Sequence, residues 1–139
     1  MATYLQTNQI VILPYVNSTI SVIDTGKVFI TPQTAGAVDV VYTLPAPSAG
    51  LHYRFINGAP AALSGSVQIN TNVAAAILYG QLITGPTDGV ALQAIAGSTQ
   101  IRFLTAVSLL SDVIDLYSDG TSWFVNAVSQ VAGGITLSP

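Results

Sequence analysis

The stretch Val113-Ile-Asp-Leu-Tyr-Ser-Asp-Gly-Thr-Ser-Trp-Phe-Val125 indicates the fold, because it encodes one complete β-hairpin. Asp119-Gly120 lies between two runs of β-branched and aromatic residues, and an Asp-Gly pair in this setting is a strong hairpin signal. Glycine tolerates positive φ, and aspartate reaches the left-handed region at low cost. We therefore predict two antiparallel strands joined by a two-residue loop.

Side-chain alternation divides this hairpin between two faces. A two-residue loop places Leu116 opposite Trp123 and Ile114 opposite Val125, and we assign these four side chains to the core. The other face carries Asp115, Tyr117, Ser122 and Phe124. Aromatic side chains outside a core are typical of subunit interfaces, so Tyr117 and Phe124 are candidate interface residues.

Short apolar runs recur at intervals of about ten residues along the rest of the chain, which is typical of a sandwich or barrel. Gly, Pro, Asn and Asp separate them, as expected of turns. The expected strands are Ile10–Leu13, Thr19–Ile23, Lys27–Thr31, Val38–Leu44, Leu51–Ile56, Ser66–Ile69, Val90–Ile95, Gln100–Leu104, Val113–Tyr117 and Trp123–Val128. Val73–Tyr79 and Thr105–Leu110 are expected to form short helical turns.

These patterns predict a single all-β domain over residues 1–139, an antiparallel β-sandwich that is jelly-roll-like or a related barrel. Residues 1–16 and 133–139 are possible extended arms, with Gly133-Gly134 as a hinge. Such an arm adds a strand to a neighbouring subunit in β-augmentation. The equally weighted alternative is that both segments are ordinary edge strands of the chain's own sheets.

Charged residues are scarce. They make up 6% of the chain, with one Lys, two Arg, six Asp and no Glu, whereas an average domain has about 25%. A soluble monomer normally covers its surface with such residues. We therefore expect a building block that buries surface against other copies or other proteins. The scattered basic residues give no electrostatic footprint for nucleic acid or anionic membrane.

Two further features bear on the class of protein. The chain has no cysteine, which excludes disulfides and thiolate chemistry. Its first residues lack the basic and apolar regions of a signal peptide, and the apolar run Val73–Ile83 is too short for a membrane span. We expect a soluble protein made without an export signal.

The few residues that chemistry requires do not form a complete site. His52 and Arg54 share one face of the expected strand Leu51–Ile56. A catalytic histidine needs a nucleophile and an orienting acid, so we place both residues at an interface, facing an aspartate of a neighbouring subunit.

The carboxylates of Asp112, Asp115 and Asp119 lie close in sequence, but they match neither a calcium loop nor a glycosidase pair. Gly85–Gly89 lacks the Gly-Lys-Ser/Thr of a phosphate loop. We therefore predict no catalytic residues, no metal site and no cofactor. Exposed aromatic residues leave a glycan-stacking surface as an alternative.

Two motifs together resemble a known class of module. Residues 43–55 follow the pattern TLPxPxxGxxxxF, and residues 114–125 follow IxLxSDGxxWxV. The pair resembles small β-rich structural modules in virions of double-stranded DNA viruses, over roughly Lys27 to Val128. These modules occur in phage head-decoration and fibre proteins and in minor capsid proteins of large eukaryotic viruses. The resemblance implies a homotrimer or a subunit embedded in a larger shell.

The sequence thus favours a non-enzymatic virion protein, made in the host cytoplasm, that decorates or cements the capsid surface as a minor capsid protein. Its expected partners are copies of itself in a homotrimer and the major capsid or other virion proteins. The first alternative is the receptor- or glycan-binding head of a viral fibre, and a carbohydrate-active enzyme is the second. The virus type, the capsid position and the neighbouring protein stay open.

Overall fold

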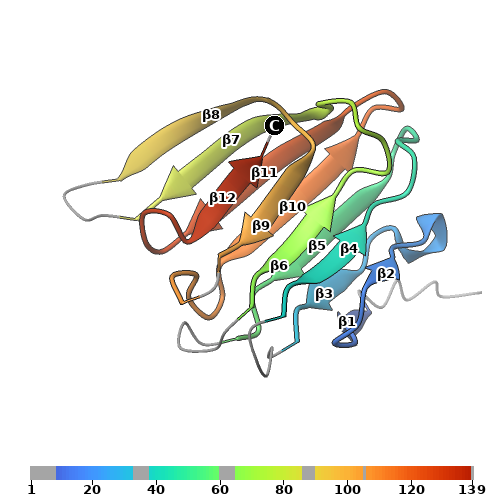
Figure 1. Cartoon of the computed structure of the whole chain (residues 1–139). Coiled ribbons are helices and arrows are strands. Elements are labelled where there is room, and N and C mark those ends of the chain that lie inside the picture. Colours follow the sequence, from blue (N-terminus) through green and yellow to red (C-terminus); the bar gives the residue numbers. More distant parts are fainter. Residues whose placement is uncertain (1–8, 33–37, 60–64, 86–89, 105, 139) are drawn as a thin grey trace, which may run out of the picture.

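Two mixed β-sheets stack face to face around an apolar core (Figure 1). The computed structural model describes residues 9–32, 38–59, 65–85, 90–104 and 106–138. The seven-stranded sheet has the order β1 (Ile10–Ile12), β3 (Val28–Ile30), β5 (His52–Ile56), β10 (Val113–Ser118), β11 (Trp123–Ser129), β7 (Leu78–Thr84) and β8 (Ala91–Ser98). The five-stranded sheet has the order β12 (Ile135–Ser138), β9 (Gln100–Phe103), β6 (Val67–Asn70), β4 (Val40–Thr43) and β2 (Ser18–Thr19).

The first half of the chain winds between the two sheets. Strands β1, β3 and β5 lie side by side and parallel in one sheet, and β2, β4 and β6 do the same in the other. Each strand crosses to the opposite sheet before the next is added, so neighbours within a sheet run in the same direction. The pair β7 and β11 is also parallel.

The expected all-β sandwich is confirmed, but its sheets are mixed and not purely antiparallel. Of the ten pairings between described strands, five are parallel. A jelly roll is built from Greek keys of antiparallel strands, and this winding differs from it. Hydrophobic alternation does not reveal strand direction, which explains why the sequence suggested the antiparallel arrangement.

Aromatic rings fill the centre of the core. Trp123 and Tyr53 are fully buried, with ring centroids 5.7 Å apart, and Phe29 stacks on Phe55 at 5.1 Å. The hydroxyl of Tyr53 donates to the carbonyl of Ser21 at 3.0 Å, which satisfies its buried polar end. Burial, followed by the nearby Asp24 carboxylate, raises the pKa of Tyr53 to about 12.

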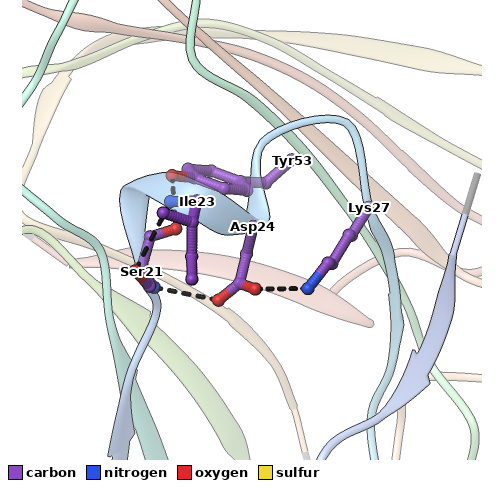
Figure 2. Close-up of polar contacts among 5 residues, drawn as sticks. All are labelled: Ser21, Ile23, Asp24, Lys27 and Tyr53. Carbon is purple, nitrogen blue, oxygen red and sulfur yellow. Dashed lines mark hydrogen bonds and ion pairs between the residues drawn. The ribbon is translucent and has the colours of Figure 1, made fainter. Parts of the chain in front are cut away.

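A turn of 3-10 helix, η1 (Val22–Asp24), replaces the second half of the expected strand Thr19–Ile23. Figure 2 shows the contacts that form it: Ser21 Oγ accepts from the Ile23 amide, and Asp24 Oδ2 accepts from the Ser21 amide. Lys27 Nζ pairs with Asp24 Oδ1 at 2.6 Å. This reciprocal capping stabilises a helical turn in spite of the β-branched residues.

The hairpin of β10 and β11 has the predicted faces and a different register. Leu116 pairs with Val125, and Trp123 pairs with Ser118, so the loop is the four residues Asp119–Ser122. The Asp119 carboxylate accepts from the amides of Thr121 and Ser122, both at 2.8 Å, and this holds the longer turn. Because the register moves by two residues, every side chain keeps its predicted face.

Strand β7 was not predicted, and the C-terminal segment forms the edge strand that was one of its two expected alternatives. The segment expected to be a helical turn, Val73–Tyr79, runs into strand β7, and residues 135–138 form β12 against β9. The C-terminal segment described here is thus an edge strand of its own sheet. At the other end, β1 is also an edge strand, and residues 1–8 of the expected N-terminal arm lie outside the described residues. No helix in the described ranges is long and apolar enough to cross a bilayer.

Candidate interaction surface

An unbroken line of aliphatic side chains crosses the outer face of the seven-stranded sheet. We name it the aliphatic row. It takes one residue from every strand, in the order Ile12, Ile30, Ile56, Val113, Val128, Ile83 and Leu92. Alternation turns these residues away from the core, and solvent reaches all of them, with Ile12 74% and Leu92 68% exposed.

A second line of side chains, the aromatic row, lies nearer the other end of the same strands. It contains His52, Tyr117, Phe124 and Tyr79, which are neighbours on β5, β10, β11 and β7. The rings of His52 and Tyr117 stack in parallel planes with centroids 4.7 Å apart. Tyr117 and Phe124 are each 45% exposed, so the rings present apolar surface to solvent.

The polar row lies between these two lines, and its charges are paired within the chain. Arg54 Nε donates to Asp115 Oδ1 at 2.7 Å, and Nη2 donates to Oδ2 at 2.9 Å. This bidentate bond, together with the charge of Asp115, raises the pKa of Arg54. Gln81 Nε2 donates to Asn126 Oδ1 at 3.2 Å next to it. The charged side chains of the polar row are therefore neutralised within the chain, without a charged group from a partner.

All four predicted interface residues lie on this face, because β5, β10 and β11 are neighbours in the sheet. They are His52, Arg54, Tyr117 and Phe124. The aspartate that Arg54 was expected to find on a neighbouring subunit is Asp115 of its own chain. Sequence reasoning missed the aliphatic row. Its members are isolated apolar residues in seven strands, and only the strand order aligns them.

The outer face of the five-stranded sheet has the opposite character. One line across it consists of Thr19, Thr43, Asn70, Gln100 and Ser138. Gln100 Nε2 donates to Asn70 Oδ1 at 2.9 Å and to Gln68 Oε1 at 2.7 Å. Hydroxyl and amide groups suit contact with water, so the two faces of the sandwich differ in what they leave exposed.

A shallow hollow of about 620 Å³ lies at one end of this polar face. Its polar lining residues are Asn70, Thr71, Asn72, Thr99, Gln100 and Ser138. These groups match a neutral ligand rich in hydroxyls, such as a sugar. The lining contains no aromatic ring for stacking and no carboxylate for acid–base chemistry.

The three neighbouring aspartates have separate structural roles. Asp112 is buried and accepts hydrogen bonds from Ser108, Leu109, Ser129 and Gln130. Asp115 binds Arg54, and Asp119 holds its turn. Within the described ranges, no three His, Cys, Asp or Glu side chains gather as metal ligands would. Each of these three carboxylates therefore has a structural role within the fold.

The sequence and the fold were also compared with known proteins. No protein-family model matches the chain, and neither a curated protein nor a solved structure matches it. The surface just described and the two sequence motifs are therefore the features that bear on function.

Proposed function

We propose that this protein is a non-enzymatic structural component of a virion, a minor capsid or decoration protein that works by assembly. It associates as a homotrimer through the outer face of the seven-stranded sheet and binds the major capsid or other virion proteins at the capsid surface. The aliphatic row, which solvent reaches in full or in part on all seven strands, is the observation that carries the assembly step. The virion assignment rests on the resemblance of the TLPxPxxG and SDGxxW motifs.

The size of the face supports a stable contact. Seven strands spaced about 4.8 Å apart and three rows about 6.8 Å apart span roughly 34 by 20 Å, or at most about 700 Å². A standard interface buries about 800 Å² on each partner. The internal pairing of Arg54 with Asp115 reduces the cost of desolvating the one charged pair in the polar row. Apolar contact is left as the main source of affinity.

Native mass measured over a range of concentrations tests this proposal. We expect wild-type protein to have the mass of three chains or a multiple of three, and Val128→Asp to shift it toward the monomer. Val128 lies in the aliphatic row, while the matched control Thr43→Asp places the same charge on the outer face of the five-stranded sheet. A monomeric wild type, or a Val128→Asp variant that assembles as wild type does, contradicts the proposal.

Salt gives a second measurement on the same samples. Because apolar contact holds the proposed assembly, its mass should change little between low and moderate NaCl, unlike an assembly that depends on exposed ion pairs. Dissociation by moderate NaCl argues for a charge-driven contact, which this face does not offer.

The polar hollow favours one alternative, the receptor- or glycan-binding head of a viral fibre. This alternative predicts that neutral oligosaccharides bind at Asn70 and Gln100, whose amides line the hollow. Titration with a glycan panel, followed by NMR or calorimetry, would then show binding that Gln100→Ala weakens and Val128→Asp leaves intact. A panel without any binder, or binding that Gln100→Ala does not affect, contradicts this role.

A further inference from the structure

Strand β8 is a long, open edge of the seven-stranded sheet. It spans the eight residues Ala91–Ser98, and among the described strands it pairs with β7 alone. An edge strand directs every second pair of backbone N–H and C=O groups away from its sheet. Such an edge can accept another strand.

The other three edges are protected in ways that β8 is not. Strand β1 has three residues and is followed by Pro14, β2 has two residues, and β12 has four residues with Pro139 next in the sequence. Short strands and prolines discourage strand addition. In β8 the one irregularity is a bulge at Gly97, where the register with β7 shifts, so Ala91–Ala96 runs straight.

The side chains of this edge are uncharged. Leu92, Ala94 and Ala96 point to the outer face of the sheet, and all three are exposed. Strands β7 and β8 contain no Asp, Glu, Lys or Arg, although charged residues are the usual protection of an edge. Leu92 also ends the aliphatic row, which therefore stops at the open edge.

We propose that β8 pairs antiparallel with β8 of a second copy, about a two-fold axis that passes through Ala94. This register pairs residues 92–96 with one another and places Leu92 of each copy opposite Ala96 of the other, a large side chain against a small one. Two alanines meet at the axis.

A second copy fits this edge better than an arbitrary partner does. The contact is isologous, because the same strand supplies both sides and so matches itself in length and in lack of charge. Pairing of the two β8 strands also leaves no free edge at β8. The inference shares with the proposed function the premise of self-assembly, but it uses a different surface. A three-fold contact through the sheet face and a two-fold contact at the edge would link trimers to one another, as the covering of a shell requires.

The chain has no cysteine, so single cysteines can report the contact directly. Residues paired across the axis have Cα atoms about 4.5–5.5 Å apart, within the range for a disulfide. Under mild oxidation, we expect Ala94→Cys to give a covalent dimer. Ala96→Cys is the matched control on the same strand and face. Its two copies lie four residues out of register, about 14 Å apart, and should stay uncrosslinked.

Mixing the Leu92→Cys and Ala96→Cys variants should produce a crosslinked heterodimer, because these positions face each other. Equal crosslinking of the Ala94→Cys and Ala96→Cys variants would indicate random collision and overturn the proposal. Absence of any Ala94→Cys dimer would also overturn it.

The edge contact and the sheet-face contact can be tested separately. Placing Val128→Asp in the Ala94→Cys background removes the proposed sheet-face contact and should leave the disulfide dimer. If wild type and Val128→Asp assemble alike while Ala94→Cys still crosslinks, the sheet-face proposal fails and the edge proposal stands. Ala94→Lys sets two charges against each other at the axis and should abolish the edge dimer without loss of folding, since Ala94 is exposed. Unchanged native mass of this variant would count against edge pairing.

Discussion

Replacement of Asp112 by asparagine should destabilise the fold by about 2–4 kcal/mol, on the energies of buried hydrogen bonds. The Asp112 side chain lies in a buried cluster that joins the loop before β10 to the segment after β11, and the residue is 1% exposed. Its Oδ2 accepts from Ser108 Oγ at 3.0 Å and from Ser129 Oγ at 2.9 Å. Its Oδ1 accepts from the Gln130 amide at 2.9 Å.

The magnitude follows from the number of acceptors. Asparagine has nearly the same shape but one oxygen, so in either orientation its NH₂ group faces a donor that the carboxylate had satisfied. If the oxygen takes the Oδ2 position, the part-buried backbone amide of Gln130 loses its partner, which costs about 1–3 kcal/mol. Loss of the charge from the remaining bonds adds about 1 kcal/mol, because bonds to charged groups are the stronger ones.

Urea and thermal unfolding measure this change. For a chain of this size, about 1 kcal/mol lowers the melting temperature by roughly 2–5 °C, so the variant should melt about 4–20 °C below wild type. Asp119→Asn is the control, because an exposed asparagine keeps the oxygen that holds its turn. An Asp112→Asn variant that unfolds at the wild-type midpoint refutes the view that both carboxylate oxygens act as acceptors.

Two further predictions concern pH. The pKa of Tyr53 is raised to about 12 in the fold, against about 10 in an unfolded chain. A raised folded-state pKa means that the unfolded chain ionises first, so the free energy of unfolding falls as pH rises from about 10 to 12. Tyr53→Phe should reduce this dependence of stability on pH. Burial also raises the pKa of Tyr42, so Tyr42 should account for part of the dependence that remains. Equal slopes for the variant and wild type would contradict the assignment to Tyr53. Asp119→Ala should lower the urea midpoint at neutral pH, because the amides of Ser122 and Thr121 lose their acceptor. These same bonds lower the pKa of Asp119, so the stability they give is present above the unfolded pKa and is lost as pH falls through the folded one. The gap between Asp119→Ala and wild type should therefore close in acid, and a constant gap would show that the carboxylate charge is irrelevant.

Local sequence patterns predicted the β10–β11 hairpin well, because its two faces depend on alternation alone. Ile114, Leu116, Trp123 and Val125 are all buried as predicted. The register was wrong because the Asp119 side chain stabilises a longer turn than Asp-Gly suggests. That error changed the pairs and not the faces, so the prediction of exposed rings at Tyr117 and Phe124 was confirmed.

The rest of the architecture depends on contacts between distant segments. Strand β7 was missed because Gly80 and Gln81 interrupt its apolar run. Gly80 nevertheless packs so closely on the backbone of Val125 that a Cβ atom there would overlap it. The parallel neighbours of β5 and β11 come from segments 25 or more residues away in sequence. No local pattern encodes such pairings, and the aliphatic row cannot form without them.

The lack of charge does not by itself locate an interface, because both faces of the sandwich have few ionisable residues. The five-stranded sheet replaces lysine and glutamate with threonine, asparagine and glutamine, which bind water without charge. The seven-stranded sheet makes no such replacement along the line from Ile12 to Leu92. Exposing that line to water is costly in proportion to its apolar area, and burying it recovers that free energy. A protein that worked as a monomer would have no reason to keep one face polar and the other aliphatic. This difference between the faces supports assembly more strongly than the overall composition does.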